Sequence, residues 1–167
     1  MEMPVFTIRG KNHRERGVDY GVQCKELIQG VLERYIRFFN GGHTAVSWDE
    51  AKVISKEFLP FIRSYSPELL DELEGIAQGA DVEFDDLLTL NSRSEAMTLV
   101  RRPPSDKEEL DGCSSVAVLP DASANGHTIL AQNWDTYTWQ EYGTVILQIL
   151  RDDGPDLMIV TEAGQLA

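Results

Sequence analysis

The residues best suited to chemistry in this chain are Gly112 and Cys113, which follow one another directly. A thiol placed immediately after a glycine carbonyl can attack that carbonyl through a small ring, and glycine permits the close approach that the attack needs. The resulting N-to-S acyl shift, followed by hydrolysis, would cut the chain before Cys113. The new terminal residue would then hold a nucleophilic thiol and an α-amino group, whose pKa of about 7.7–8.0 makes it a usable base near neutrality.

A simpler interpretation of Cys113 stays open, and spacing alone favours it. Gly-Cys pairs are common, so this thiol can equally be a small side chain packed in a strand. Cys24 falls on the apolar face of a predicted helix, and we expect it to be a buried hydrophobic side chain. A cysteine–histidine dyad of Cys113 with His127 has weak support, because nothing in the sequence brings the two residues together.

Metal and cofactor sites are not expected. His13, His43 and His127 have no cysteine or histidine partner at the spacing that metal ligands require. The chain also lacks the two glycine-rich fingerprints, G-x-x-x-x-G-K-[ST] and G-x-G-x-x-G, that cradle phosphates. We therefore expect neither a metal ion nor an organic cofactor of the protein's own.

The overall charge argues against polyanionic partners. The 167 residues include 15 Lys and Arg against 28 Asp and Glu, a formal net charge of −13. Nucleic acids and anionic membranes are bound by basic side chains, so we expect neither as a partner. No apolar run approaches the roughly 20 residues of a membrane span, and the N-terminus shows no signal peptide. Two cysteines make no disulfide framework, which predicts a cytoplasmic protein.

Helical periodicity dominates the first two thirds of the chain. Apolar residues recur at spacings of three and four from Tyr20 to Phe39, which predicts one amphipathic helix. Ser47 and Glu50 form a capping box at the start of a second helix, in which Pro60 is a kink or an end. Ser66-Pro67 opens a third helix. A fourth is predicted over residues 84–97.

Strands follow an exposed connector at residues 101–111, which is rich in proline and charge. Four short β-branched segments with turn residues between them predict an antiparallel run of strands. The segments are residues 114–119, 128–133, 144–150 and 157–161, and residues 5–9 can form an opening strand. The pattern predicts an α+β fold. Because the strand run stops at Ala167 with an uncovered edge, we also expect the chain to be truncated.

Several segments together resemble one family. They are 111–115 (Asp-Gly-Cys-Ser-Ser), 132–135 (Gln-Asn-Trp-Asp), 161–164 (Thr-Glu-Ala-Gly), and the upstream stretches 74–80 and 90–95. In this order and spacing they resemble the acyl-coenzyme A:6-aminopenicillanic acid acyltransferase family of N-terminal nucleophile hydrolases. The resemblance implies an αββα sandwich, preceded by a helical α (pro) region, and autocatalytic maturation of a zymogen.

The resemblance also implies roles for particular residues. Cleavage between Gly112 and Cys113 would give an α part of residues 1–112 and a β part from residue 113, with Cys113 as nucleophile. Asp135 matches the family's acidic residue near the new amino terminus; without the resemblance it is a solvated carboxylate at a strand end. Asn133, Gln132 and Ser114 would be supporting hydrogen-bonding groups, although the family often has Thr at the position of Ser114.

Two departures bear on substrate and completeness. The related bile-salt and penicillin V hydrolases usually carry Arg where this chain has Gln132, which argues against their substrates. The family's oxyanion-hole Asn and its further catalytic Ser and Arg lie beyond residue 167. We expect a self-processing cysteine acyltransferase or amidohydrolase acting on linear amides or acyl thioesters, including acyl-coenzyme A, with an amine or water as acceptor. The alternative is an inactive truncated homologue that acts as a binding or folding module.

Overall fold

The computed structural model describes residues 3–99, 112–152 and 154–166, and the predicted connector at 101–111 therefore lies outside the described residues. The described chain folds into two compact units with an α+β composition. The first comprises residues 3–99 and 140–166, and the second residues 112–139. The boundary between the units does not fall at residue 113, because residues 140–152 and 154–166 belong to the same unit as the helices. The covalent division before Cys113 stays a prediction.

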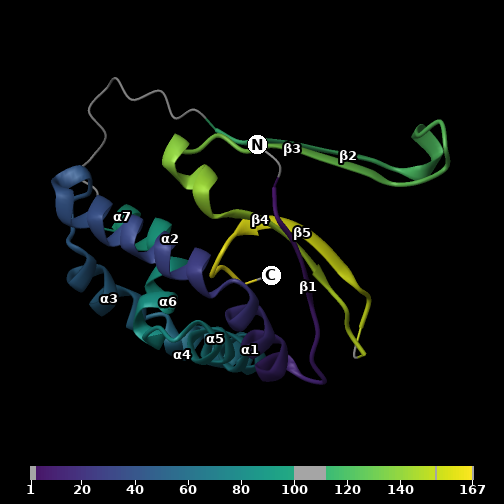
Figure 1. The fold of residues 1–167 in the computed structure, drawn as a ribbon. Coiled ribbons are helices and arrows are strands. Elements are labelled where there is room, and N and C mark those ends of the chain that lie inside the picture. The colour runs from purple at the N-terminus through teal and green to yellow at the C-terminus, as the bar shows by residue number, and fades with distance from the viewer. Residues whose placement is uncertain (1–2, 100–111, 153, 167) are drawn as a thin grey trace. The chain divides into compact units, whose positions relative to one another are not determined.

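Helices make up most of the first unit, coloured purple to teal in Figure 1. The capping box is confirmed: the Ser47 side chain accepts a hydrogen bond from the Glu50 amide, and the Glu50 carboxylate accepts one from the Ser47 amide. The described helices are α1 (His13–Gln23), α2 (Lys25–Phe38), the π-helical turn η1 (Phe39–His43), α3 (Trp48–Lys56), α4 (Leu59–Tyr65), α5 (Pro67–Ala80), α6 (Phe84–Asn91) and α7 (Arg93–Leu99).

Helices α1 and α5 cross at a contact made of backbone. Gly17 and Gly21 on α1 face Gly75 and Gly79 on α5. A Cβ atom at Gly17 would lie 2.1 Å from the carbonyl oxygen of Glu72, and one at Gly21 would lie 2.4 Å from that of Ile76. Only glycine lets two helix backbones approach this closely. The pair therefore forms a rigid frame on which the rest of the unit packs.

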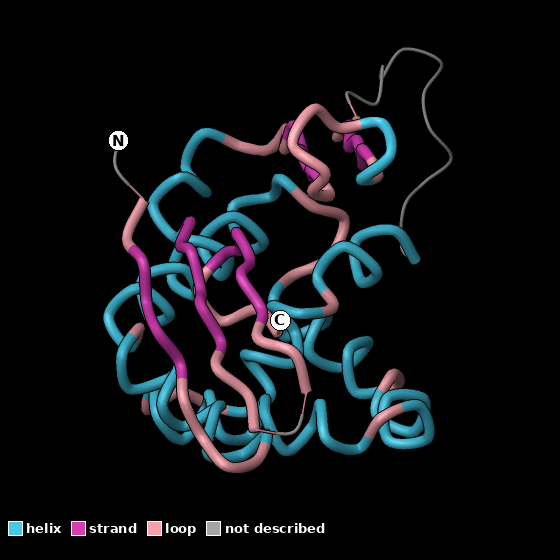
Figure 2. Tube along the Cα trace, turned by 90° about the vertical axis from the view of Figure 1, so that its right-hand side faces the viewer, coloured by secondary structure: helices cyan, strands magenta, loops and turns pink. Residues whose placement is uncertain are grey.

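Three strands form the sheet of the first unit, in the order β1–β4–β5. Figure 2 shows them side by side. β1 (Val5–Ile8) runs parallel to β4 (Thr144–Ile149), which pairs antiparallel with β5 (Leu157–Glu162). The sheet thus joins the beginning of the chain to its last described strands.

The two faces of this sheet have different surroundings. Helices lie against one face (Figure 1), where β4 buries Val145, Leu147 and Ile149. On the other face Ile146 lies between Val5 and Val160 in a row across the strands. Val5 and Val160 are 59% and 55% exposed. The sheet is therefore covered on one side and presents an apolar row on the other.

The second unit is built around an antiparallel hairpin. β2 (Ser114–Val118) pairs with β3 (Ile129–Asn133), and the short 3-10 turn η2 (Pro120–Ala122) lies in the connection. Gly126 has a positive φ of 71°, the conformation in which glycine is favoured. A second 3-10 segment, η3 (Thr138–Gly143), leads from this unit into β4.

Several predictions of element boundaries were wrong. The single helix over residues 20–39 is broken at Cys24, whose backbone is not helical (φ −106°, ψ 13°). The helix over residues 84–97 is broken at Ser92, whose backbone is not helical (φ −118°, ψ 16°) and whose hydroxyl donates a hydrogen bond to the Leu88 carbonyl. Pro60 lies in the first turn of α4, where its missing N–H costs nothing. Because apolar periodicity continues across single-residue breaks, it cannot reveal them.

The predicted antiparallel run of four strands was also wrong as one sheet. It forms two separate pairs, β2–β3 and β4–β5, and β1 joins β4 in parallel. The positions of the strands themselves are confirmed, with each boundary within one residue of the predicted one. Alternation shows where strands lie, but their partners depend on packing that a single sequence does not display.

Candidate active site

The hairpin brings Cys113 to Asp135. Ser114 pairs with Asn133 at the open end of the β2–β3 ladder, and Cys113 and Asp135 lie one and two residues beyond this end. The Cys113 thiol lies 3.7 Å from the backbone oxygen of Asp135, within hydrogen-bonding distance for sulfur. The Cys113 thiol is exposed in this unit. Cys24, by contrast, is buried as expected, at 1% exposure.

Asn133 holds the Asp135 carboxylate. Its side-chain amide donates to both carboxylate oxygens, at 3.0 and 3.1 Å. A carboxylate that accepts such bonds has its orientation fixed. The Cys113 thiol, just before β2, therefore lies at the same end of the hairpin as the Asn133 amide and the Asp135 carboxylate that this amide orients.

The other predicted site residues lie in the same hairpin. Ser114 opens β2 opposite Asn133, and Gln132 pairs with Ser115. His127, in contrast, precedes β3 at the far end of the ladder, five paired residues from Cys113. At about 3.4 Å of rise per residue this separation rules out the Cys113–His127 dyad.

Aromatic side chains follow Asp135, and the sequence analysis did not single them out. The rings of Tyr137 and Trp139 stack with centroids 5.8 Å apart and planes 13° from parallel. Tyr137 is 56% exposed. Two residues of chain span at most about 7 Å, so this pair lies near the carboxylate. The signal was three aromatic residues among 134–139, a density well above the chain's 8%.

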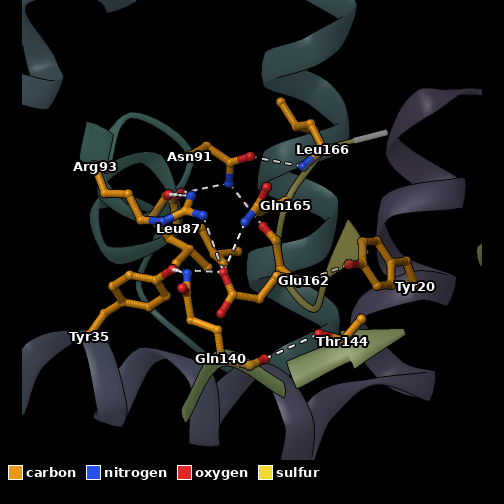
Figure 3. A network of polar contacts seen from close by, with 12 residues as sticks. Tyr20, Tyr35, Leu87, Asn91, Arg93, Gln140, Thr144, Glu162, Gln165 and Leu166 are labelled. Carbon is orange, nitrogen blue, oxygen red and sulfur yellow. Dashed lines mark hydrogen bonds and ion pairs between the residues drawn. The ribbon is translucent and has the colours of Figure 1, made fainter. Parts of the chain in front are cut away.

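A second cluster of functional groups lies buried in the first unit (Figure 3). The Glu162 carboxylate accepts hydrogen bonds from the Tyr35 hydroxyl at 2.8 Å, the Gln165 amide at 3.0 Å and the Arg93 guanidinium at 3.2 Å. Gln140 donates its side-chain amide to the same Tyr35 hydroxyl. The Arg93 guanidinium also lies 4.9 Å from the centre of the Tyr35 ring. We call Tyr35, Arg93, Gln140 and Glu162 the polar clamp.

Burial governs the electrostatics of this clamp. Glu162 is 1% exposed, and desolvation raises the pKa of its carboxyl although Arg93 and Tyr35 oppose the shift. Desolvation likewise raises the pKa of the Tyr35 hydroxyl, so this group stays protonated and donates its hydrogen bond. In the sequence, residues 90–95 and 161–164 are two separate segments of the family resemblance, with nothing to show that they meet. Arg93 and Glu162 are 69 positions apart in the sequence, so no local pattern could join them.

Among the residues that the structure describes, no group of three or more His, Cys, Asp or Glu is placed to hold a metal ion. His13 instead contacts the Glu72 carboxylate at 3.0 Å, and His43 stacks on Phe38. None of the described helices has the length and apolar character needed to cross a membrane.

Comparison with known proteins gives two informative relatives, although no family model matches the chain. The acyl-coenzyme A:6-aminopenicillanic-acid-acyltransferase 40 kDa form of Emericella nidulans is 30% identical over 151 residues, covering 87% of this chain and 39% of the fungal protein. The beta-alanyl-dopamine/carcinine hydrolase of Drosophila melanogaster is 28% identical over 158 residues, covering 90% of this chain and 38% of the insect protein.

The chain therefore spans about two-fifths of the length of these relatives. One relative is named as an acyltransferase and the other as a hydrolase. They bear out the resemblance that the motifs around Cys113, Asp135 and Glu162 carry, and the chain is similar to the acyltransferase-like family.

Proposed function

We propose that this chain is the nucleophile-bearing part of a self-processing cysteine enzyme that transfers or hydrolyses the acyl groups of amides and thioesters. The observation that carries the proposal is the hairpin register, which sets the exposed Cys113 thiol 3.7 Å from the Asp135 backbone. The relationship to an acyltransferase and a hydrolase supplies the reaction class. We place the enzyme in the cytoplasm, where its two thiols stay reduced.

Maturation would begin with the Cys113 thiol attacking the carbonyl carbon of Gly112. The bond between that carbon and the Cys113 nitrogen breaks, the nitrogen takes the proton that the thiol loses, and a thioester forms. Water then hydrolyses the thioester, which leaves the Gly112 carboxylate and restores the thiol. Both residues are exposed, so water reaches the thioester.

Acyl transfer would use the α-amino group that maturation creates. This amine takes the thiol proton while the Cys113 sulfur adds to the substrate's carbonyl carbon. The leaving amine or thiol takes the proton back, and the acyl group stays on sulfur as a thioester. An acceptor amine or water then attacks that thioester, and the thiol is restored. Asp135, oriented by Asn133, would hold the protonated amine near the sulfur.

The fold of the first unit supports an N-terminal nucleophile sandwich. Its sheet carries helices on one face and an apolar row of Val5, Ile146 and Val160 on the other. An apolar sheet face needs a covering layer, and in an αββα sandwich a second sheet provides it.

Intact-protein mass spectrometry of the full-length gene product tests maturation. We expect two fragments that separate before Cys113, and a single uncut chain for Cys113→Ala. Cys24→Ala is the matched control, because it removes the buried thiol and should leave cleavage unchanged. A full-length wild-type protein that stays whole would contradict self-processing and favour the binding or folding module.

A second measurement separates acyl transfer from hydrolysis. The matured protein is incubated with an acyl thioester or an amide, and the acid-quenched protein is examined for an acyl mass on the fragment that begins at Cys113. Added amine should divert the acyl group from water if the enzyme is a transferase. No acyl adduct on Cys113 with any donor would contradict the acyl-enzyme.

A further inference from the structure

We propose that Asn125–Gly126, in the loop that closes the β2–β3 hairpin, is a site of spontaneous covalent modification at which the chain converts its own asparagine into isoaspartate. The reaction uses these two residues and water, so it is independent of the cleavage and acyl transfer proposed above. The sequence holds two Asn-Gly pairs, Asn40–Gly41 and Asn125–Gly126. Their surroundings differ, and the difference predicts that the second pair reacts much faster in the native protein.

The chemistry is attack by a backbone nitrogen on the side chain that precedes it. The Gly126 nitrogen gives its proton to hydroxide or water and adds to the Cγ carbon of Asn125. The bond between Cγ and Nδ2 breaks, ammonia leaves with a proton taken from water, and a five-membered succinimide ring forms. Water then opens the ring at one of its two carbonyl carbons. Opening at Cγ gives aspartate, and opening at the main-chain carbonyl carbon gives isoaspartate.

The loop leaves the attacking nitrogen accessible. Gly126 has no Cβ atom to crowd its nitrogen, and a Cβ placed there would meet no atom within 4 Å. Both Asn125 and Gly126 are exposed, so water and hydroxide reach the peptide bond between them. The Gly126 N–H donates a long hydrogen bond, 3.4 Å, to the Ser123 carbonyl oxygen. A bond of this length is weak, so it restrains the nitrogen little.

Hydrogen bonds hold the Asn125 side chain beside this nitrogen. Its Oδ1 atom accepts from the His127 amide at 3.1 Å, and this bond closes a ring of atoms that includes the Gly126 nitrogen. The Ser123 hydroxyl lies 3.3 Å from the same Oδ1 atom and 3.2 Å from the Pro120 carbonyl oxygen. Negative charge develops on Oδ1 when the nitrogen adds to Cγ. Donors already in place at a developing oxyanion lower the barrier to such a step.

The other Asn-Gly pair is held in a helical turn. Asn40 and Gly41 are also exposed, so exposure does not distinguish the two sites. Both residues lie in η1, where backbone amides are committed to helical hydrogen bonds. The Asn40 Oδ1 atom accepts from the Trp48 amide at 3.0 Å, which ties the side chain to the first residue of α3. Ring closure at Asn40 therefore has to disrupt the turn and this bond.

The products differ from the parent in charge and in backbone length. Each conversion replaces a neutral amide by a carboxylate, which adds one negative charge to a chain whose formal net charge is −13. Isoaspartate also adds one carbon atom to the main chain, which then runs through the former side chain of Asn125. Older molecules of the protein would thus carry a group that isoaspartate-specific carboxyl methyltransferases recognise.

Peptide mapping of the full-length gene product by mass spectrometry tests the site. The native protein and the same protein unfolded in guanidinium chloride are incubated side by side at mildly alkaline pH, and samples are digested at successive times. Deamidation exchanges an amide nitrogen for an oxygen, and peptide fragmentation assigns this mass change to residue 40 or residue 125. Electron-transfer fragmentation separates isoaspartate from aspartate.

The two asparagines serve as controls for each other. In the native protein we expect Asn125 to react at least about tenfold faster than Asn40, the ratio equivalent to one backbone hydrogen bond that ring closure at Asn40 must break. In the unfolded protein the two rates should converge, because each asparagine then precedes a glycine in a free chain. Asn125→Gln should react far more slowly at position 125, since its ring would need six members, and should leave the rate at Asn40 unchanged.

The rate at Asn125 should also rise with pH, because the deprotonated nitrogen is the attacking group. The proposal is overturned if native Asn40 reacts as fast as Asn125. It is equally overturned if Asn125 stays an amide in the native protein over a time in which the unfolded protein converts it. Neither result depends on whether the chain cleaves itself before Cys113.

Discussion

Replacing Gly75 by alanine tests whether the crossing of α1 and α5 is the frame of the first unit. The new Cβ atom would lie 2.3 Å from the Arg14 carbonyl oxygen and 2.9 Å from the Val18 amide nitrogen. Comfortable contacts between non-bonded atoms lie at about 3.5–4.0 Å, so the two helices must separate by about 1 Å. Both obstacles are backbone atoms, which cannot rotate away.

The magnitude follows from two opposing terms. Overpacking of this kind costs about 3 kcal/mol, the upper end of the usual range. Alanine returns about 1 kcal/mol, because it is a better helix former than glycine. We expect Gly75→Ala to lower the free energy of unfolding by about 2 kcal/mol, which corresponds to roughly 4–8 °C in melting temperature.

Gly30→Ala on α2 is the matched control. Its Cβ atom would meet the Tyr142 ring, with the hydroxyl oxygen at 2.5 Å, but Tyr142 is a side chain that is 42% exposed and can turn away. This change should be neutral, or stabilising by up to about 1 kcal/mol. Urea unfolding of the full-length product, followed by circular dichroism, measures both variants. Equal midpoints for Gly75→Ala and the parent protein, or an equal loss for Gly30→Ala, would refute the reasoning.

Three further predictions concern single side chains. Iodoacetamide at pH 8 should label the exposed Cys113 in the native protein and spare Cys24, because burial raises the pKa of the Cys24 thiol to about 12. Peptide mapping identifies the labelled cysteine, and faster labelling of Cys24 than of Cys113 would contradict the assigned exposures. Ser47→Ala should lower the free energy of unfolding by about 1 kcal/mol by removing the cap of α3, whereas Ser64→Ala, at an exposed helical position, should change it little. Glu162 has a folded-state pKa above its ordinary value of 4.5, so the native state holds this proton more tightly than the unfolded state. The contribution of this proton to stability is therefore complete below pH 4.5 and is lost as the pH rises through the folded-state pKa. Urea titrations at a series of pH values should show the parent losing stability relative to Glu162→Gln as the pH rises from 4.5 through the folded-state pKa.

Local chemistry made much of this fold predictable. The Ser47 capping box, the helix start at Ser66-Pro67 and the positions of the strands follow from side-chain patterns within a few residues of each other. The juxtaposition of Cys113 with Asp135 needed only a hairpin with turn residues between its strands. These features were accessible because each is decided by neighbours in sequence.

Features decided by distant neighbours were not accessible. The helix-to-helix contact of Gly17 with Gly75 and the bond between Arg93 and Glu162 depend on packing between segments more than 50 residues apart. The parallel pairing of β1 with β4 is of the same kind. The sequence around a glycine or an arginine does not identify the distant residue that it contacts in the fold, so a single sequence does not reveal these contacts.

Because both strands of the β2–β3 hairpin are exposed, the length of the loop between them determines how the strands pair. Strand register is normally set by burying one face, but here Val116, Ile129 and Leu130 are all at least 46% exposed. The length of the connection between residues 118 and 129 then sets the strand register, and with it the position of Cys113 relative to Asp135. Substitutions in that loop should be tolerated. Inserting or deleting one residue, in contrast, would shift the register of β2 against β3 and separate the Cys113 thiol from Asp135. For anyone redesigning this protein, loop length is the quantity to preserve.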